Sequence, residues 1–326
     1  MSLLAKSKGE VTYKELSTLH KWALVVLISM GLVDHLRADV SEERLLRSTD
    51  AALGATNADL GLMVSAYGIA AMICYLPSGI VADIVRVRTL SWVGFGITAL
   101  LTFWYALFPS LTTIRMLFVA MGISTILIWW GIRYKLVRLI SEEDGYSRNI
   151  GLSYAFYGLA GLILGFFNSW LVTHLASQGD IVPMRVLLFI LGGIIMVLAL
   201  LSFLFIPKFA GEIGSSEGGF EVKQLGQVLI NPVVWLAAAT LFFVYFFYTG
   251  VNQTTGYMKD VMNLAPAVVT VVATVRTYGV SLLSAPIFGG VAEKVGSPSR
   301  VIATGSIIAA LLFGVFVFLP SGATRL

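Results

Sequence analysis

The sequence has a single cysteine, Cys74, and few charged residues. One cysteine excludes an intramolecular disulfide framework and a cysteine metal centre, so we interpret Cys74 as an ordinary small residue of a helix. Only 12% of the 326 residues are Asp, Glu, Lys or Arg, about half the share in soluble domains. The apolar share is 57% and the mean hydropathy is +0.87. A chain of this length cannot hide so much apolar surface from water, so we expect lipid to solvate it.

The motifs of common enzymes and of ATP-driven proteins are also missing. The chain has no G-x-x-x-x-G-K-[ST] phosphate loop, no H-E-x-x-H zinc motif and no G-x-S-x-G nucleophile motif, and its three histidines are scattered. We therefore predict no enzyme activity, no cofactor and no bound metal, and any energy input must come from a gradient. The pI of about 9.1 reflects basic residues spread over loops, so we expect no nucleic-acid partner.

Nine apolar segments are long enough, at about 20 residues, to cross the hydrocarbon as helices. No small-residue cleavage site follows the first segment, so we expect a polar tail and a retained span rather than a signal peptide. With that tail in the cytoplasm, the inner loops carry about twice as many Lys and Arg residues as the outer loops. We therefore expect an all-α protein of the bacterial inner membrane. The segments lie roughly at 22–42, 59–81, 88–108, 112–134, 149–172, 185–206, 232–256, 265–291 and 299–320.

A polar stretch at 207–231, rich in Gly and Ser, divides the chain into two unequal parts. Residues 1–206 are predicted to form an N-terminal six-helix bundle with its cytoplasmic tail. Residues 232–326 are predicted to form a partial C-terminal bundle of three helices, with 207–231 as a cytoplasmic linker.

A short polar signature lies between the second and third spans and returns, in a weaker form, between the eighth and ninth. The first copy reads Gly-Ile-Val-Ala-Asp-Ile-Val-Arg-Val-Arg at 79–88, and the second begins 210 residues later. Two copies of one signature, each between apolar spans, indicate a duplicated membrane unit, which is typical of secondary transporters built from repeats. The signature residues are Gly79, Asp83, Arg86 and Arg88 in the first copy and Gly289 and Glu293 in the second.

The first copy resembles the signature of the major facilitator superfamily, G-x-x-x-D-[RK]-x-G-[RK]-[RK]. Gly79 and Asp83 match it, whereas Ile84 and Arg86 replace its first basic residue and its second glycine. The resemblance implies the major facilitator fold, which normally has twelve spans, so nine spans imply a truncated chain. Within the superfamily, the stretch 235–286 looks most like bacterial permeases for sugars and organic anions.

By the same resemblance, the signature residues belong to a gate. The Asp83 carboxylate is expected to pair with basic groups at the cytoplasmic helix ends and to hold the outward-facing state, in contacts that break as the bundles move. The alternative is a turn that only sets the topology. The other basic residues of the inner side are interpreted mainly as topology determinants, any of which could partner Asp83: Arg133, Lys135, Arg138 and Arg148.

A charged residue inside a span is a functional candidate, because its insertion costs about 2.5–3.5 kcal/mol. Arg276 lies close to the middle of the eighth span. Its planar guanidinium suits a carboxylate, phosphate or sulfonate, and we interpret it as an anion-binding residue of a central cavity. The alternative is a structural arginine paired with a carbonyl or carboxylate of a neighbouring helix.

Asp34 and Arg37 form a second candidate site, on the outer part of the first span. Asp34 lies roughly 18 Å along the helix axis from Trp22, which marks the inner end of the span. The two residues are three apart, so they share a helix face and can pair. Asp34 is a candidate proton carrier, since burial raises a carboxyl pKa and a neighbouring arginine lowers it again. Arg37 is a candidate substrate ligand. The alternative is that the span ends near Val33 and both residues lie in a loop.

Aromatic and amide side chains complete the predicted cavity, because they can hydrogen-bond a hydroxylated solute while keeping an apolar body. For each of them alone, packing between helices is the alternative. These substrate-binding candidates are Tyr67, Tyr154, Tyr157, Tyr248, Asn252 and Gln253.

Together these features predict a monomeric secondary transporter for a small polar or anionic solute, such as a sugar, a sugar acid or an organic anion. We expect symport with protons or coupling to a counter-solute, and the predicted partners are the solute and the lipid bilayer. The alternative is a transport-incompetent remnant, or a membrane sensor, that keeps the fold without three of its helices.

Overall fold

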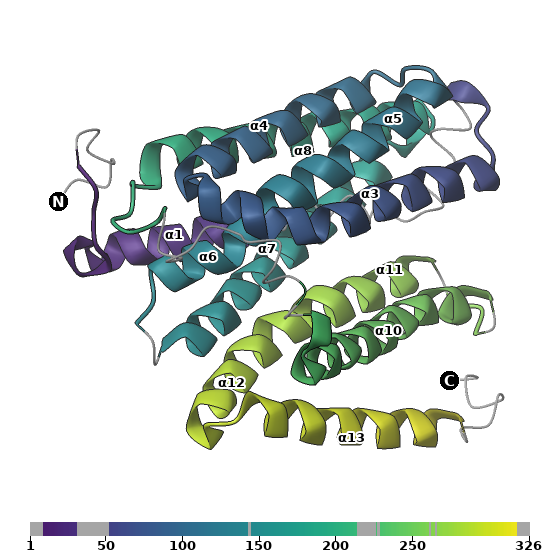
Figure 1. Ribbon diagram of the computed structural model, residues 1–326. Helices are drawn as coiled ribbons and strands as arrows, with labels where there is room; N and C mark the ends of the chain where they lie inside the picture. Colours follow the sequence, from purple (N-terminus) through teal and green to yellow (C-terminus); the bar gives the residue numbers. More distant parts are fainter. Residues whose placement is uncertain are drawn as a thin grey trace.

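The computed structural model describes residues 9–30, 52–142, 145–213, 226, 229–260, 262–264 and 266–317. In this part of the chain, helices form an N-terminal bundle and a smaller C-terminal group (Figure 1). The bundle contains α1 (Thr18–Met30), α3 (Asn57–Ile84), α4 (Val87–Ala106), α5 (Leu111–Gly122), η3 (Ile123–Trp130), α6 (Gly131–Leu139), α7 (Tyr146–His174) and α8 (Ile181–Phe205), with short turns η1 (Tyr13–Glu15) and η5 (Ala176–Gln178). The C-terminal group contains α10 (Pro232–Asp260), α11 (Pro266–Thr274), η6 (Val275–Gly279), α12 (Val280–Val295) and α13 (Pro298–Val317).

Six of the described helical stretches are long and apolar enough to cross a membrane. They are Ala58–Ile84, Val87–Ala106, Leu111–Leu139, Tyr146–Leu171, Ile181–Phe205 and Val268–Val295. Three shorter apolar stretches lie where the sequence predicts the first, seventh and ninth spans: Thr18–Leu27, Pro232–Tyr248 and Pro298–Leu312. An all-helical membrane fold is therefore confirmed for the described residues, and the count of nine spans stays a prediction.

A capping box starts α3. The Thr56 hydroxyl accepts a hydrogen bond from the Asp59 N–H at 3.3 Å, and Asp59 Oδ2 accepts one from the Thr56 N–H at 2.9 Å. Each side chain thus satisfies an N–H that the helix leaves free at its start. Asp59 also forms an ion pair with Arg115 of α5, which ties the N-terminal ends of α3 and α5 together.

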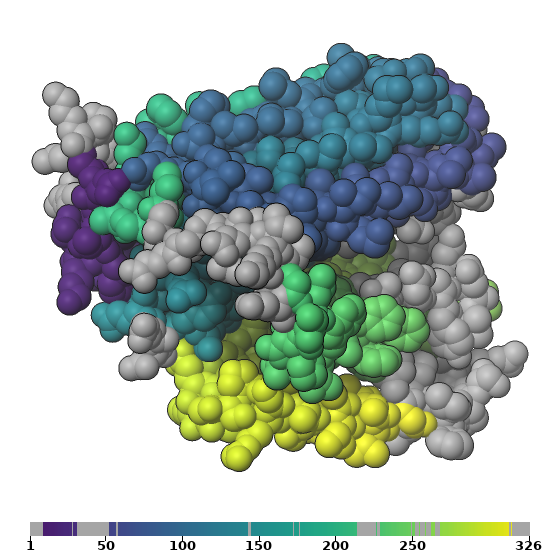
Figure 2. All heavy atoms as spheres, in the orientation of Figure 1, coloured from purple at the N-terminus to yellow at the C-terminus, as the bar shows by residue number. Residues whose placement is uncertain are grey.

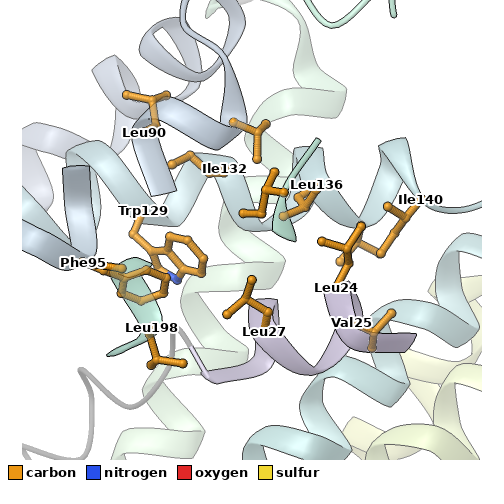
Figure 3. Packing of buried hydrophobic residues seen from close by; sticks show 14 of the residues in the cluster. Leu24, Val25, Leu27, Leu90, Phe95, Trp129, Ile132, Leu136, Ile140 and Leu198 are labelled. Atoms are coloured by element: carbon orange, nitrogen blue, oxygen red, sulfur yellow. The ribbon is translucent and has the colours of Figure 1, made fainter. Parts of the chain in front are cut away.

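Two large clusters of buried side chains, and a smaller one around Cys74, hold the described part of the N-terminal bundle together. In the cluster shown in Figure 3, the ring centroids of Phe95 and Trp129 lie 4.1 Å apart, and Leu27 and Leu198 belong to the same cluster. These four side chains come from α4, η3, α1 and α8, so the cluster joins helices that are distant in sequence. The second cluster packs α3, α4, α5 and α8 through residues such as Met63. In lipid, dispersion contacts of this kind are a principal attraction between helices.

The C-terminal group packs on the bundle along α7 and α12, where glycines allow the two backbones to approach closely. A Cβ on Gly151 would lie 2.6 Å from the Ala285 carbonyl oxygen, and a Cβ on Gly289 would lie 3.0 Å from the Ser147 carbonyl oxygen. Glycines commonly permit such contacts between membrane helices. In Figure 2, yellow atoms of the C-terminal group meet teal atoms of the bundle at this junction.

The two copies of the polar signature lie at the same end of the molecule. The turn from α3 to α4 and the turn from α12 to α13 are both at the left in Figure 1. The second turn requires a left-handed residue, and Gly296 supplies it with φ of +63°. We call this end of the molecule the Asp83 end.

We predict that Gly151→Ala lowers the free energy of unfolding by about 1–3 kcal/mol, because the new methyl group collides with the backbone of α12. Gly193→Ala is the control, since the same methyl on α8 meets no atom within 4 Å. Thermal unfolding in detergent should show a lower midpoint for the first variant and an equal or higher midpoint for the second, in which alanine only improves helix propensity. Equal midpoints for both variants would contradict this packing.

Candidate functional site

A fully buried arginine lies in the membrane-spanning part of the N-terminal bundle. Arg133 is in the first turn of α6 and is 0% exposed. Its Nη2 donates to Ser153 Oγ at 3.1 Å, and its Cζ lies 4.1 Å from the centroid of the Tyr154 ring. Its Nε and Nη1 have no hydrogen-bond acceptor within the part of the chain that the structure describes. A buried cation that is only partly hydrogen-bonded destabilises a protein, which marks Arg133 as a functional candidate.

Tyrosines from both groups of helices lie near this guanidinium or near its tyrosine neighbours. The hydroxyls of Tyr134 and Tyr154 lie 3.5 Å apart. Tyr245 of α10 is close enough to Tyr154 and Arg133 to interact electrostatically with both, and Tyr75 of α3 interacts in the same way with Tyr154 and Tyr245. Because Tyr245 belongs to the C-terminal group, side chains of both groups contribute to these interactions. We call the following residues the arginine–tyrosine cluster: Arg133, Ser153, Tyr75, Tyr134, Tyr154 and Tyr245.

Arg133 and Arg276, which both lie within described spans, are in or next to π-helical segments. The segment η3 runs over eight residues and ends at Trp130, three residues before Arg133. The shorter segment η6 contains Arg276. Long π-helical segments are rare, and π turns inside α-helices often mark functional sites.

Arg276 contacts its own group of helices. Its Nη1 donates to the Val251 carbonyl oxygen at 3.1 Å and to Thr254 Oγ1 at 2.7 Å, and both acceptors belong to α10. These are the contacts expected of a structural arginine, the alternative given for this residue in the sequence analysis. Its role in anion binding therefore stays a prediction, and Arg133 is the better-placed candidate.

At the Asp83 end, the side chain of Asp83 is 67% exposed and has one basic neighbour among the described residues. Lys135 of α6 lies 3.9 Å from Asp83 Oδ1 and also donates to the Ala82 carbonyl oxygen. The two arginines of the signature have partners other than Asp83. Arg86 pairs with carboxylates, and the Arg88 guanidinium lies 4.8 Å from the centroid of the Phe203 ring. An ion pair with so exposed a partner contributes little to stability.

Glu293, in the second signature copy, reaches the N-terminal bundle. Its Oε1 accepts a hydrogen bond at 2.7 Å from the N–H of Arg148, in the first turn of α7. A carboxylate is favourable there, because the start of a helix presents free N–H groups and the positive end of the helix dipole. The contact adds a polar connection between the two groups of helices beside the glycine contact at Gly289.

The sequence of residues 17–325 matches the Major Facilitator Superfamily. The chain belongs to this family. This match confirms the family that the two signature copies indicate. Members of the Major Facilitator Superfamily are membrane transporters. The finer resemblance to sugar and organic-anion permeases stays a prediction.

Curated relatives are similar over most of this chain. It is 25% identical over 264 residues to the inner membrane protein YqcE of Escherichia coli K12. The aligned region covers 79% of this chain and 62% of that protein. It is 25% identical over 309 residues to an uncharacterized MG294 homolog of Mycoplasma pneumoniae, covering 86% of this chain and 64% of that protein. The inner membrane protein YihN of Escherichia coli K12 is 22% identical over 228 residues, covering 68% and 54%. The chain thus spans less than two thirds of the length of these relatives.

Among the predicted ligands whose side chains the structure describes, Tyr67, Tyr154, Tyr157 and Tyr248 have different neighbours. Tyr154 belongs to the arginine–tyrosine cluster, whereas Tyr67 bonds to Thr125 Oγ1 at 3.1 Å and the Tyr157 ring packs 5.5 Å from the ring of Tyr278. Tyr248 is half-exposed, with its ring 6.3 Å from that of Tyr245. Asp34 and Arg37 lie outside the described residues, as do the side chains of Asn252 and Gln253 on α10.

Sequence reasoning interpreted Arg133 mainly as a topology determinant near the end of the fourth span and did not single it out as a site residue. In the structure the helix continues to Leu139, and Arg133 is buried within it. The signal is present in the sequence: apolar residues continue after Arg133, and Leu136 and Val137 are themselves fully buried.

We predict that Arg133→Met raises the free energy of unfolding of the solute-free protein by about 1–3 kcal/mol, because an apolar side chain of similar length replaces a partly satisfied buried charge. Ser153 keeps its hydrogen bond to the Ile150 carbonyl oxygen at 2.9 Å in this variant. Arg138→Met, at an exposed position of the same helix, should change stability by no more than about 0.5 kcal/mol. Unfolding in detergent measures both, and a less stable Arg133→Met protein would show that the arginine has a structural role.

Proposed function

We propose that this chain binds a small polar or anionic solute between its two groups of helices and moves it across the inner membrane by alternating access, as a secondary transporter. The observation that carries the proposal is the partly hydrogen-bonded guanidinium of Arg133, which is fully buried in the N-terminal bundle and has Tyr245 of the C-terminal group as an electrostatic neighbour. A buried cation of this kind is retained against its cost when it has an anion to bind.

The chemistry of the arginine–tyrosine cluster supports this class of solute. The Nε and Nη1 donors of Arg133 suit the oxygens of a carboxylate, sulfonate or phosphate. The Tyr154 ring lies beside the guanidinium and restricts its orientation, which lowers the entropy lost on binding. Tyrosine hydroxyls both donate and accept, so they suit the hydroxyl groups of a sugar acid or another hydroxylated anion.

Alternating access needs contacts between the two groups that can break. At the Asp83 end, the described contacts include the glycine contact of α7 with α12 and the hydrogen bond from the Arg148 N–H to Glu293. Their presence supports a state that is closed at this end. With a cytoplasmic N-terminus, this state faces outward, and Asp83, Gly79, Arg86 and Arg88 belong to the inner gate together with Gly289 and Glu293.

A ligand-stabilisation screen tests the proposal. Purified protein in detergent is heated with neutral sugars, sugar acids, sulfosugars and organic anions, each at matched ionic strength. A ligand that binds only the folded state raises the unfolding midpoint, by about 2.7 kcal/mol of stability at a hundredfold excess over its Kd. We expect an anionic solute to raise the midpoint of the wild-type and Arg138→Met proteins and to leave that of Arg133→Met unchanged.

Two outcomes would count against the proposal. If Arg133→Met keeps the full midpoint shift with the anionic solute, Arg133 is not part of the site. If only Arg276→Ala loses this shift, Arg276 is the residue that binds the anion. If no solute of any class shifts the wild-type protein, the alternative of a transport-incompetent remnant or sensor is favoured.

Proton coupling is proposed to depend on Asp34. In proteoliposomes, Asp34→Asn should keep the exchange of labelled solute for unlabelled solute, because binding and the conformational change remain. It should lose uphill accumulation driven by a pH gradient, because the carboxyl group that carries the proton is missing. Accumulation at the wild-type level by Asp34→Asn would reject Asp34 as the proton carrier.

A further inference from the structure

A second buried charge lies at the Asp83 end, outside both copies of the signature. Glu212 follows α8, and its side chain is 0% exposed. The carboxylate accepts hydrogen bonds from the N–H of Val87, which is the first residue of α4, and from the N–H of Phe209 at 3.4 Å. The free N–H groups and the positive dipole end at the start of α4 offset part of the cost of burying this negative charge.

Arg86 connects this carboxylate to the start of the chain. Its Nη1 lies 3.7 Å from Glu212 Oε2, and its Nη2 donates to Glu10 Oε1 at 2.5 Å. Arg86 precedes α4 in the turn that follows α3, so one guanidinium joins the turn to two acidic residues that are about 200 positions apart in the sequence.

Two backbone hydrogen bonds hold the N-terminal arm, residues 9–17, against the segment that contains Glu212. The Val11 N–H donates to the Lys208 carbonyl oxygen at 2.8 Å, and the Ala210 N–H donates to the Val11 carbonyl oxygen at 3.1 Å. The arm, the α3–α4 turn and the segment after α8 therefore all meet at Glu212.

We propose that Glu212 is the positioning residue of the α3–α4 turn: it fixes the start of α4 and, through Arg86, attaches the N-terminal arm to the turn that carries Asp83. The proposal rests on the proposed function only in treating this turn as part of a gate. Glu212 acts through other residues and does not touch the solute site.

The charges around Glu212 give this contact a pH dependence. Arg86 faces it from the turn and Lys135 from α6, and Glu10 and Asp83 lie behind these two cations. Burial raises the pKa of the Glu212 carboxyl above its ordinary value of 4.5, although the two N–H donors and the two cations oppose the shift. Glu212 thus binds a proton more tightly when buried than when exposed, so proton uptake favours the assembled contact. The turn should therefore be held more firmly as the pH falls from neutral toward 4.5.

Hydrogen exchange of the full chain in lipid nanodiscs tests the proposal through the Val87 amide, with rates corrected for intrinsic exchange at each pH. We expect protection of this amide to rise as the pH falls in the wild type. In Glu212→Ala it should drop on the order of tenfold to a hundredfold and lose its pH dependence, because the acceptor is gone. Glu212→Gln keeps an acceptor oxygen without the charge, so it should restore high protection that does not change with pH.

Two variants of the arm are the controls. Glu10→Gln should reduce protection of residues 9–17 and leave the Val87 amide protected with its pH dependence, because Glu212 is intact. Glu15→Gln changes an exposed carboxylate that bonds Thr12, and it should behave like the wild type at Val87. Wild-type protection at Val87 in Glu212→Ala, or the wild-type pH dependence in Glu212→Gln, would overturn the proposal.

A transport readout separates this proposal from the proposed function. If the α3–α4 turn is part of a gate, Glu212→Ala should lower the maximal rate of uptake in proteoliposomes and leave the half-saturation concentration unchanged. Uptake that is absent from the wild type itself would reject the proposed function, whereas the exchange of the Val87 amide would still decide the role of Glu212.

Discussion

Hydrocarbon offers no water to a charged or polar group, and this constraint orders the described structure. Its ionised side chains gather at the helix ends, where carboxylates meet free N–H groups, as Asp59 does at the start of α3 and Glu293 at the start of α7. Arg276 and Arg133 depart from this rule, and the guanidinium of Arg133 lies inside the bundle with a hydroxyl and two tyrosine rings as its described partners. A charge kept in such a place is more easily explained by a ligand than by stability.

The two groups of helices meet at the junction of α7 with α12. The two helices approach so closely that backbone meets backbone at Gly151, and Tyr245 of the same C-terminal group interacts electrostatically with Arg133 and Tyr154. The same junction ends near Glu293, where one hydrogen bond joins the two groups. A carrier that binds its solute between two groups of helices needs contacts that can part without unfolding either group.

Much of the fold follows from the sequence, because apolar length and the two signature copies are strong local signals. The site follows less well. Arg276 stands out in the sequence as a lone charge in a span, but its hydrogen bonds to Val251 and Thr254 depend on how α10 packs beside η6. Arg133 was classed by its nearness to a predicted helix end, and only the length of the folded helix places it inside. Glu212 gave no signal, since its partners Val87 and Arg86 are more than 100 residues away.

The π-helical segment η3, which precedes α6, changes the direction of the side chains that follow it. An α-helix turns by about 100° per residue, and a π turn takes in roughly one residue more than an α turn. The angular phase of every side chain after Trp130 is therefore offset from that of an uninterrupted helix. A helical wheel drawn through the whole span without this offset therefore does not give the direction of Arg133, whose guanidinium contacts Ser153 and Tyr154.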